Sequence, residues 1–252
     1  MALQFLARLR RSGRPTPDAM TLAEHIGELR TRVLIATAAV LAGGIAAFVL
    51  YQPIIDFLQH PYCQVTGPRH CTFYVTAPLQ GLSVRMKVAT YGGLFLGSPI
   101  ILWELWRFIT PGLNRKEKRY LIPFVLASVL LFAFGVALAY VIFPHAMQFL
   151  DSIGGPSLRQ IYSPTSYLSL VLALMALFGV AFEFPLVLVG LELVGLVQPR
   201  TLAHGRRWAF VIIVAGAAIF TPSGDPFSML ALAVPLYVFY ELAIVIGRLL
   251  AR

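Results

Sequence analysis

Six long runs of apolar residues constrain this chain more than any other feature of its sequence. They cover residues 33–51, 88–106, 123–143, 166–194, 208–220 and 227–246. A helix needs about 20 mostly apolar residues to cross a hydrocarbon core of about 30 Å. The run over 208–220 is too short for a full crossing, so a locally thinner bilayer or burial against other helices has to compensate.

The runs predict membrane helices rather than the strands of a barrel. Barrel strands alternate apolar and polar side chains over about 10 residues, whereas residues 211–219 are apolar throughout. Of all residues, 58% are hydrophobic and only 12% are charged, compared with about 25% charged in a soluble domain. This composition excludes a soluble globular enzyme, a disordered regulator and a secreted disulfide scaffold. We therefore predict an all-α, polytopic membrane protein with six transmembrane helices.

The basic residues predict how these helices are oriented. Sixteen of the 20 Lys and Arg residues lie before the first run, between the second and third, between the fourth and fifth, or after the sixth. Because such residues mark cytoplasmic loops, we expect both termini to be cytoplasmic and segments 52–87, 144–165 and 221–226 to face outside. In a soluble protein the net charge of +9 would suggest a nucleic-acid partner; here it indicates orientation, and no nucleic acid is expected.

Two acidic residues stand out on the predicted cytoplasmic side. Thr21 and Glu24 form a capping box that starts a helix, and one face of that helix carries Glu28 and then Arg32. There are two interpretations of Glu28. Either it forms an ordinary i,i+4 ion pair with Arg32, worth about 0.2–0.5 kcal/mol, or it binds a ligand. Glu117 stands among four basic residues, which either neutralise it or leave it as an anionic spot that receives a cation from a partner.

A third acidic residue lies inside the fourth run. An acid at the centre of a membrane helix costs about 2.5–3.5 kcal/mol, so Glu183 should face protein or water rather than lipid. Pro185 beside it should kink the helix. Either Glu183 has a functional role, or its carboxyl group is protonated and hydrogen-bonded to a neighbouring helix. A secondary transporter that uses Glu183 for proton coupling is the alternative function, although no internal repeat of the kind common in transporters is evident.

The two cysteines share one predicted outer segment. Oxidising conditions there allow Cys63 and Cys71 to form a disulfide that closes a small loop; otherwise they are two free thiols. The sequence has no metal-ligand spacing among its five histidines, and it has no Gly-x-Ser-x-Gly, His-Glu-x-x-His or P-loop motif. We therefore expect no metal, no cofactor and no enzymatic activity.

Five segments, in order, resemble the TatC family, whose members are core subunits of the twin-arginine protein translocase. They are EHIGELR (24–30), SPIILWELWRFITPGL (98–113), KEKR (116–119), FGVAFEFP (178–185) and FTPSGD (220–225). The resemblance implies one six-helix domain over residues 20–248 in a glove-shaped arrangement. Residues 1–19 are then a cytoplasmic extension, and residues 249–252 are a cytoplasmic tail.

The resemblance implies a receptor and scaffold rather than an enzyme. TatC proteins bind signal peptides that carry consecutive arginines, and they assemble with the single-span subunits TatA and TatB. Folded proteins then cross the membrane, driven by the protonmotive force. The expected setting is the bacterial cytoplasmic membrane, with lipid contacts and several copies of the chain in one complex.

The resemblance also assigns roles to particular residues. Positions matching Glu28 and Glu117 line the site for the two arginines, and three further positions are associated with signal-peptide recognition: Arg30, Phe108 and Arg119. Glu183 matches the polar feature inside the membrane, on the concave face. Other positions match functionally sensitive ones: Pro61, Tyr140 and Asp225. One departure is Met229, which stands where many members carry a polar residue.

The chemistry of the side chains fits this assignment. A guanidinium is planar and pairs with a carboxylate through two parallel hydrogen bonds, which an ammonium cannot do. Two separated carboxylates on the cytoplasmic side are therefore expected to select Arg-Arg over Lys-Lys.

Overall fold

A computed structural model of the chain describes residues 22–67, 71–75, 77–109, 121–153, 162–193, 195–222 and 224–250. All regular secondary structure in these ranges is helical, which confirms the all-α prediction. The described helices, in chain order, are α2 (Leu22–Val49), α3 (Tyr51–Thr66), α4 (Gln80–Ile109), α5 (Leu121–Ile153), α6 (Pro164–Ala181), α7 (Phe184–Leu193), α8 (Pro199–His204), α9 (Arg206–Phe220) and α10 (Pro226–Leu250).

Five stretches of the described helices are long and apolar enough to cross a membrane. They are His25–Val49, Gln80–Ile109, Leu121–Ile153, Pro164–Leu193 and Pro226–Leu249. These correspond to five of the six predicted runs. Helix α9, which carries the remaining run, has only 15 residues, or about 22 Å at about 1.5 Å per residue. The count of six spans therefore stays a prediction.

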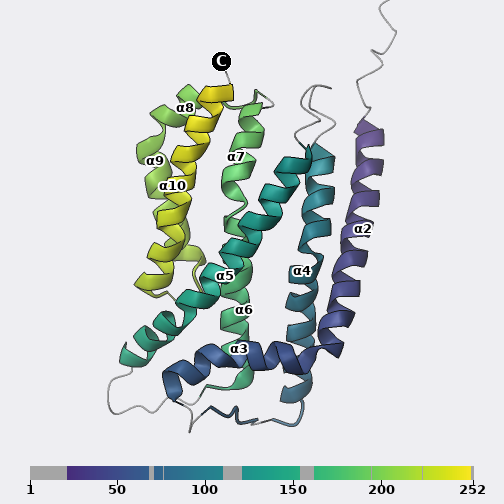
Figure 1. The fold of residues 1–252 in the computed structure, drawn as a ribbon, viewed down its shortest axis with the longest axis vertical. Helices are drawn as coiled ribbons and strands as arrows, with labels where there is room; N and C mark the ends of the chain where they lie inside the picture. Colours follow the sequence, from purple (N-terminus) through teal and green to yellow (C-terminus); the bar gives the residue numbers. More distant parts are fainter. Residues whose placement is uncertain are drawn as a thin grey trace, which may run out of the picture.

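Figure 1 shows how the helices are arranged. Helices α2 and α4 stand side by side at one edge of the molecule, α8, α9 and α10 form the opposite edge, and α6 continues into α7 between them. Helix α5 crosses obliquely, and α3 lies across the lower end. The beginning of α2 and the end of α10 both lie at the upper end of the molecule.

The first helix is longer than the first apolar run. The capping box predicts a helix start near Thr21, and α2 runs without a break from Leu22 to Val49 and packs against α4. The helix therefore begins close to the expected point, and its charged first turns extend the spanning helix.

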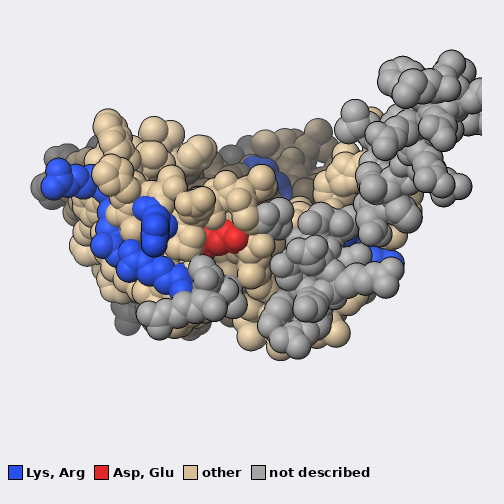
Figure 2. All heavy atoms as spheres, turned by 90° about the horizontal axis from the view of Figure 1, so that it is seen from above, with Lys and Arg blue, Asp and Glu red and all other residues tan. Residues whose placement is uncertain are grey.

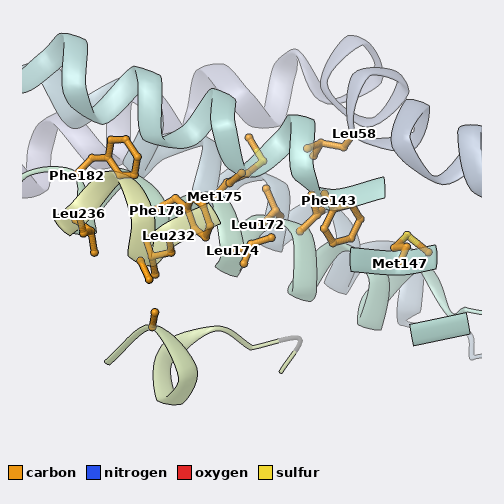
Figure 3. Packing of buried hydrophobic residues seen from close by; sticks show 14 of the residues in the cluster. Leu58, Phe143, Met147, Leu172, Leu174, Met175, Phe178, Phe182, Leu232 and Leu236 are labelled. Carbon is orange, nitrogen blue, oxygen red and sulfur yellow. The ribbon is translucent and has the colours of Figure 1, made fainter. Parts of the chain in front are cut away.

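The apolar core lies around α6, which packs against α4, α5 and α10. Part of this core appears in Figure 3, including Phe143 of α5, Phe178 of α6 and Leu232 of α10. Phe143 and Phe178 are completely buried. Because lipid tails are as apolar as these side chains, close packing rather than the exclusion of water holds such helices together.

Glycines allow α2 and α4 to approach each other very closely. A Cβ atom added to Gly93 would lie 2.5 Å from the carbonyl oxygen of Val40 and 2.9 Å from the backbone nitrogen of Gly44. A Cβ atom on Gly43 would in turn lie 3.0 Å from the carbonyl oxygen of Gly93. Small residues at such a crossing let helix backbones touch within a membrane. This contact sets the distance between α2 and α4 at their crossing, in the lower part of α2.

We predict that Gly93→Ala destabilises the protein. The added methyl group must push the two backbones apart, at a cost of about 1–3 kcal/mol, and should lower the thermal unfolding midpoint of the purified protein in detergent. Gly216→Ala on α9 is the control, because a Cβ atom there would meet nothing within 4 Å. Equal midpoints for the two variants would contradict this account of the α2–α4 contact.

Candidate functional site

A charged cluster joins the upper ends of α2 and α4. Arg32 Nε donates to Glu28 Oε1 at 3.1 Å, and Arg32 Nη2 forms an ion pair with the same oxygen. Arg32 Nη1 donates to Glu104 Oε2 on α4 at 2.7 Å. The side chains of Glu28, Arg32 and Glu104 are 21%, 13% and 9% exposed. One guanidinium therefore holds two carboxylates in a partly buried position.

Only half of this cluster was visible in the sequence. The Glu28–Arg32 pair follows from helical spacing, whereas Glu104 lies 72 residues from Arg32 and has no local signal that points to α2. Glu28 Oε2 is buried, and no hydrogen-bond donor among the described residues reaches it. The ordinary ion-pair interpretation of Glu28 therefore accounts for one of its oxygens and leaves the other without a partner in the described part of the chain.

Phe108 lies next to this cluster, one helical turn beyond Glu104. Its ring stacks on that of His25, with a distance of 4.4 Å between centroids and an angle of 19° between planes. Arg30, on the same helix as His25, is exposed. The structure thus places Phe108 at the helix face that carries Glu28. Glu117 and Arg119 lie outside the described residues.

An apolar hollow of about 150 Å³ runs along α2 and α4 from this cluster. Apart from the ion-paired Arg32 and Glu104, its lining side chains are apolar: Leu29, Val33, Ala36, Ile101, Leu105 and Phe108. A segment with charged residues at one end and apolar residues after them would match both the cluster and this hollow.

The upper face of the molecule carries basic side chains. Figure 2 shows Lys and Arg side chains gathered over α8, α9 and α10, the helices that carry Arg200, Arg206, Arg207 and Arg248. Arg206 Nη2 forms an ion pair with Glu241 at 2.8 Å. This basic face lies at the end of the molecule that the sequence predicts to be cytoplasmic.

Glu183 lies at a break between α6 and α7. Pro185 has no backbone N–H with which to continue the helix, and residues 182–183 form a turn there. Trp106 Nε1 donates to Ser128 Oγ at 2.7 Å, and Ser128 Oγ in turn donates to Glu183 Oε2. The residue is only 9% exposed, and Glu183 Oε1 has no partner among the described residues. Glu183 therefore faces protein, as the cost of an acid in lipid requires.

Pro61 and Tyr140 are linked through one backbone carbonyl. Pro61 lies inside α3 and lacks the N–H that would bond to the carbonyl of Phe57, four residues earlier. Tyr140 Oη of α5 donates to this Phe57 carbonyl at 2.9 Å, and the rings of Phe57 and Tyr140 stack with centroids 4.3 Å apart. Tyr140 thus supplies the hydrogen bond that Pro61 removes.

The structure also shows contacts for two further pairs or positions that the sequence singled out, the two cysteines and Asp225. Cys63 at the end of α3 forms a disulfide with Cys71, with 4.9 Å between the Cα atoms. Asp225 is fully buried, and its Oδ1 accepts a hydrogen bond from the backbone N–H of Ser228 at 2.7 Å. This bond caps the N-terminus of α10, where Pro226 occupies the first helical position.

The end of the molecule that the sequence predicts to face outside contains two neighbouring tyrosines, the buried Tyr62 and the half-buried Tyr162. Burial and the nearby Asp151 carboxylate raise the pKa of the Tyr62 hydroxyl above its ordinary value. Burial and a hydrogen bond to Asp151 do the same for the pKa of Tyr162. Both hydroxyls therefore stay protonated in the neutral pH range. Within the described ranges, no three His, Cys, Asp or Glu side chains are grouped so that they could hold a metal ion.

Comparisons with known proteins point to one family. The family described as Sec-independent protein translocase protein (TatC) matches residues 24–235. A TatC protein of Frankia casuarinae is 37% identical over 250 residues, which is 95% of this chain and 69% of the relative. A TatC protein of Aquifex aeolicus is 36% identical, over 92% of this chain and 97% of the relative.

Solved structures agree with the sequence relatives. A crystal structure described as the twin arginine translocase receptor TatC superimposes with a TM-score of 0.75 at 35% identity. The match covers 90% of this chain and all of the solved chain. At this level of identity the likeness extends beyond the fold to the sequence.

We predict that Tyr140→Phe costs about 0.5–1.5 kcal/mol of stability, because the Phe57 carbonyl loses its donor. In a Pro61→Ala background the same substitution should cost less, since the restored backbone N–H can reach that carbonyl. A double-mutant cycle of thermal unfolding in detergent measures the difference. If Tyr140→Phe cost the same in both backgrounds, the two positions would not be coupled through this carbonyl.

Proposed function

Because the chain belongs to the TatC family and is thus a component of a Sec-independent protein translocase, we propose that it is the receptor for signal peptides with two consecutive arginines. The observation that carries this proposal is the α2–α4 cluster, in which Glu28 keeps one buried oxygen that no described donor reaches. A guanidinium already fits between the two carboxylates of this cluster, so the site suits the functional group of an arginine.

Each recognition residue has a distinct role in the proposal. Glu28 accepts one signal arginine, and Glu117 accepts the other. Arg30, Phe108 and Arg119 line the site. The apolar segment that follows the arginines lies in the hollow that begins beside Phe108. Charge-assisted hydrogen bonds to carboxylates are about twice as strong as neutral ones, and a planar guanidinium makes them with better geometry than an ammonium.

The remaining features of the family complete the proposal. The chain lies in the bacterial cytoplasmic membrane with both termini in the cytoplasm, in contact with lipids. It is the core of a complex with TatA-like and TatB-like subunits and with further copies of itself. Folded proteins cross the membrane through this complex, driven by the protonmotive force. Glu183 holds a water molecule or a polar group of a partner helix inside the bilayer, which suits its unpaired Oε1.

We predict that Glu28→Ala and Glu117→Ala each weaken binding of a twin-arginine peptide by about ten- to a hundredfold, the equivalent of losing one charged hydrogen bond. The measurement is peptide affinity for the full chain in nanodiscs. Glu241→Gln is the control, because that acid pairs with Arg206 on α9, away from the site. Unchanged affinity in both Ala variants, with normal membrane insertion, would refute the receptor role.

We predict that Glu183→Leu abolishes export of a folded reporter with a twin-arginine signal, because Leu has no polar atom with which to hold a partner. Glu183→Gln should retain much of the export, since its amide oxygen still accepts from Ser128. The assay uses cells that lack their own TatC-type protein. Normal export by Glu183→Leu would exclude this role. Proton-driven uptake of a small molecule by proteoliposomes, lost in Glu183→Gln, would instead support the transporter alternative.

A further inference from the structure

Arg32 makes, within this chain, the contact that the receptor is proposed to make with its ligand. Its guanidinium donates twice to Glu28 Oε1 and once to Glu104 Oε2. Glu28 Oε1 is therefore already occupied, and only Oε2 remains for an incoming group. A signal arginine that is to take both oxygens of Glu28 must first displace this internal guanidinium.

The charge balance of the cluster depends on Glu104. Two carboxylates and one guanidinium leave one net negative charge, whereas Glu28 and Arg32 alone would be neutral and would attract no further cation. Glu104 is 9% exposed and Glu28 is 21% exposed. The more deeply buried acid thus neutralises Arg32, and the negative charge stays on Glu28, whose side chain is the more exposed of the two although its Oε2 is buried.

We propose that Arg32 is a positioning residue that occupies Glu28 in the empty receptor and is retained by Glu104 when a signal arginine takes its place. This inference rests on the proposed function. The exchange needs no helix movement, because Arg32 Nη1 already donates to Glu104 at 2.7 Å and keeps that bond while it releases Glu28. The close backbone contact between α2 and α4 holds both acids in position.

The exchange also explains discrimination against lysine. A signal guanidinium replaces the two bonds that Arg32 Nε and Nη2 make to Glu28 Oε1 with two of its own to Glu28, so few hydrogen bonds are lost. An ammonium cannot reproduce this planar fork, and it would displace Arg32 without replacing both of its bonds. Competition from an internal arginine therefore penalises Lys-Lys more than Arg-Arg.

The test measures the affinity of the full chain in nanodiscs for a twin-arginine peptide and for its twin-lysine counterpart. Arg32→Gln should tighten twin-arginine binding about three- to tenfold and twin-lysine binding by more, so that discrimination falls. Glu104→Gln should weaken twin-arginine binding by a similar factor, because Arg32 then pairs with Glu28 alone. These factors correspond to the loss of one partly buried ion pair. The double variant Arg32→Gln/Glu104→Gln should bind more tightly than Glu104→Gln.

Arg107→Gln is the matched control for a general effect of charge. Arg107 is an exposed basic residue in the last turn of α4, and its replacement changes the net charge as Arg32→Gln does. A much smaller gain than that of Arg32→Gln is expected. If Arg32→Gln does not fold, the double variant still decides, because it removes the more deeply buried Glu104 carboxylate together with its cation and leaves only the more exposed Glu28 unpaired.

Two results would overturn the inference. One is weaker binding in Arg32→Gln and in Glu104→Gln alike, with no gain in the double variant, which indicates a purely structural ion pair. The other is an equal gain from Arg107→Gln and Arg32→Gln. In either case the proposed function stands if Glu28→Ala still weakens binding of the twin-arginine peptide. If Glu28→Ala binds normally, the receptor role itself fails.

Discussion

The close contact between the backbones of α2 and α4 is the constraint on which the candidate site depends. Gly43, Gly44 and Gly93 leave room only for backbone atoms at this crossing. With the helices fixed at that distance, the side chains above the crossing meet in a defined register. Arg32 can then reach Glu28 on its own helix and Glu104 on the next. A wider separation would leave Glu104 as a buried acid with no cation, which is among the most costly arrangements in a membrane protein.

Backbone hydrogen bonding imposes the second constraint, because a proline inside a helix leaves the carbonyl four residues earlier without its helical donor. Prolines inside the helices remove donors, and the structure shows how two sites respond. At Pro61 the freed carbonyl of Phe57 receives Tyr140 Oη from α5. At Pro185 the helix is interrupted instead, and the turn places Glu183 against Ser128. Both positions therefore combine a proline with a polar side chain that makes a hydrogen bond beside it.

The site also reconciles the two interpretations of Glu28, as a helical ion pair and as a ligand-binding residue. Glu28 is paired with Arg32, as an ordinary helical ion pair would be, and it also keeps a buried oxygen without a described donor. The two interpretations are compatible because Glu104 shares the guanidinium. An internal arginine that is held by two acids leaves one of them able to bind an external arginine.

The sequence by itself determined the helical class, the positions of the apolar runs, the break near Pro185 and the Glu28–Arg32 pair. These depend on the length of apolar segments, on the missing N–H of proline and on spacing within one helix, all of which are local. Tertiary structure decided that Arg32 also pairs with Glu104 and that Phe108 stacks on His25. It also decided that Tyr140 donates a hydrogen bond to the carbonyl that Pro61 leaves without its helical donor. Each of these contacts joins two helices, and it depends on how closely and in what register their backbones pack, which no local pattern encodes.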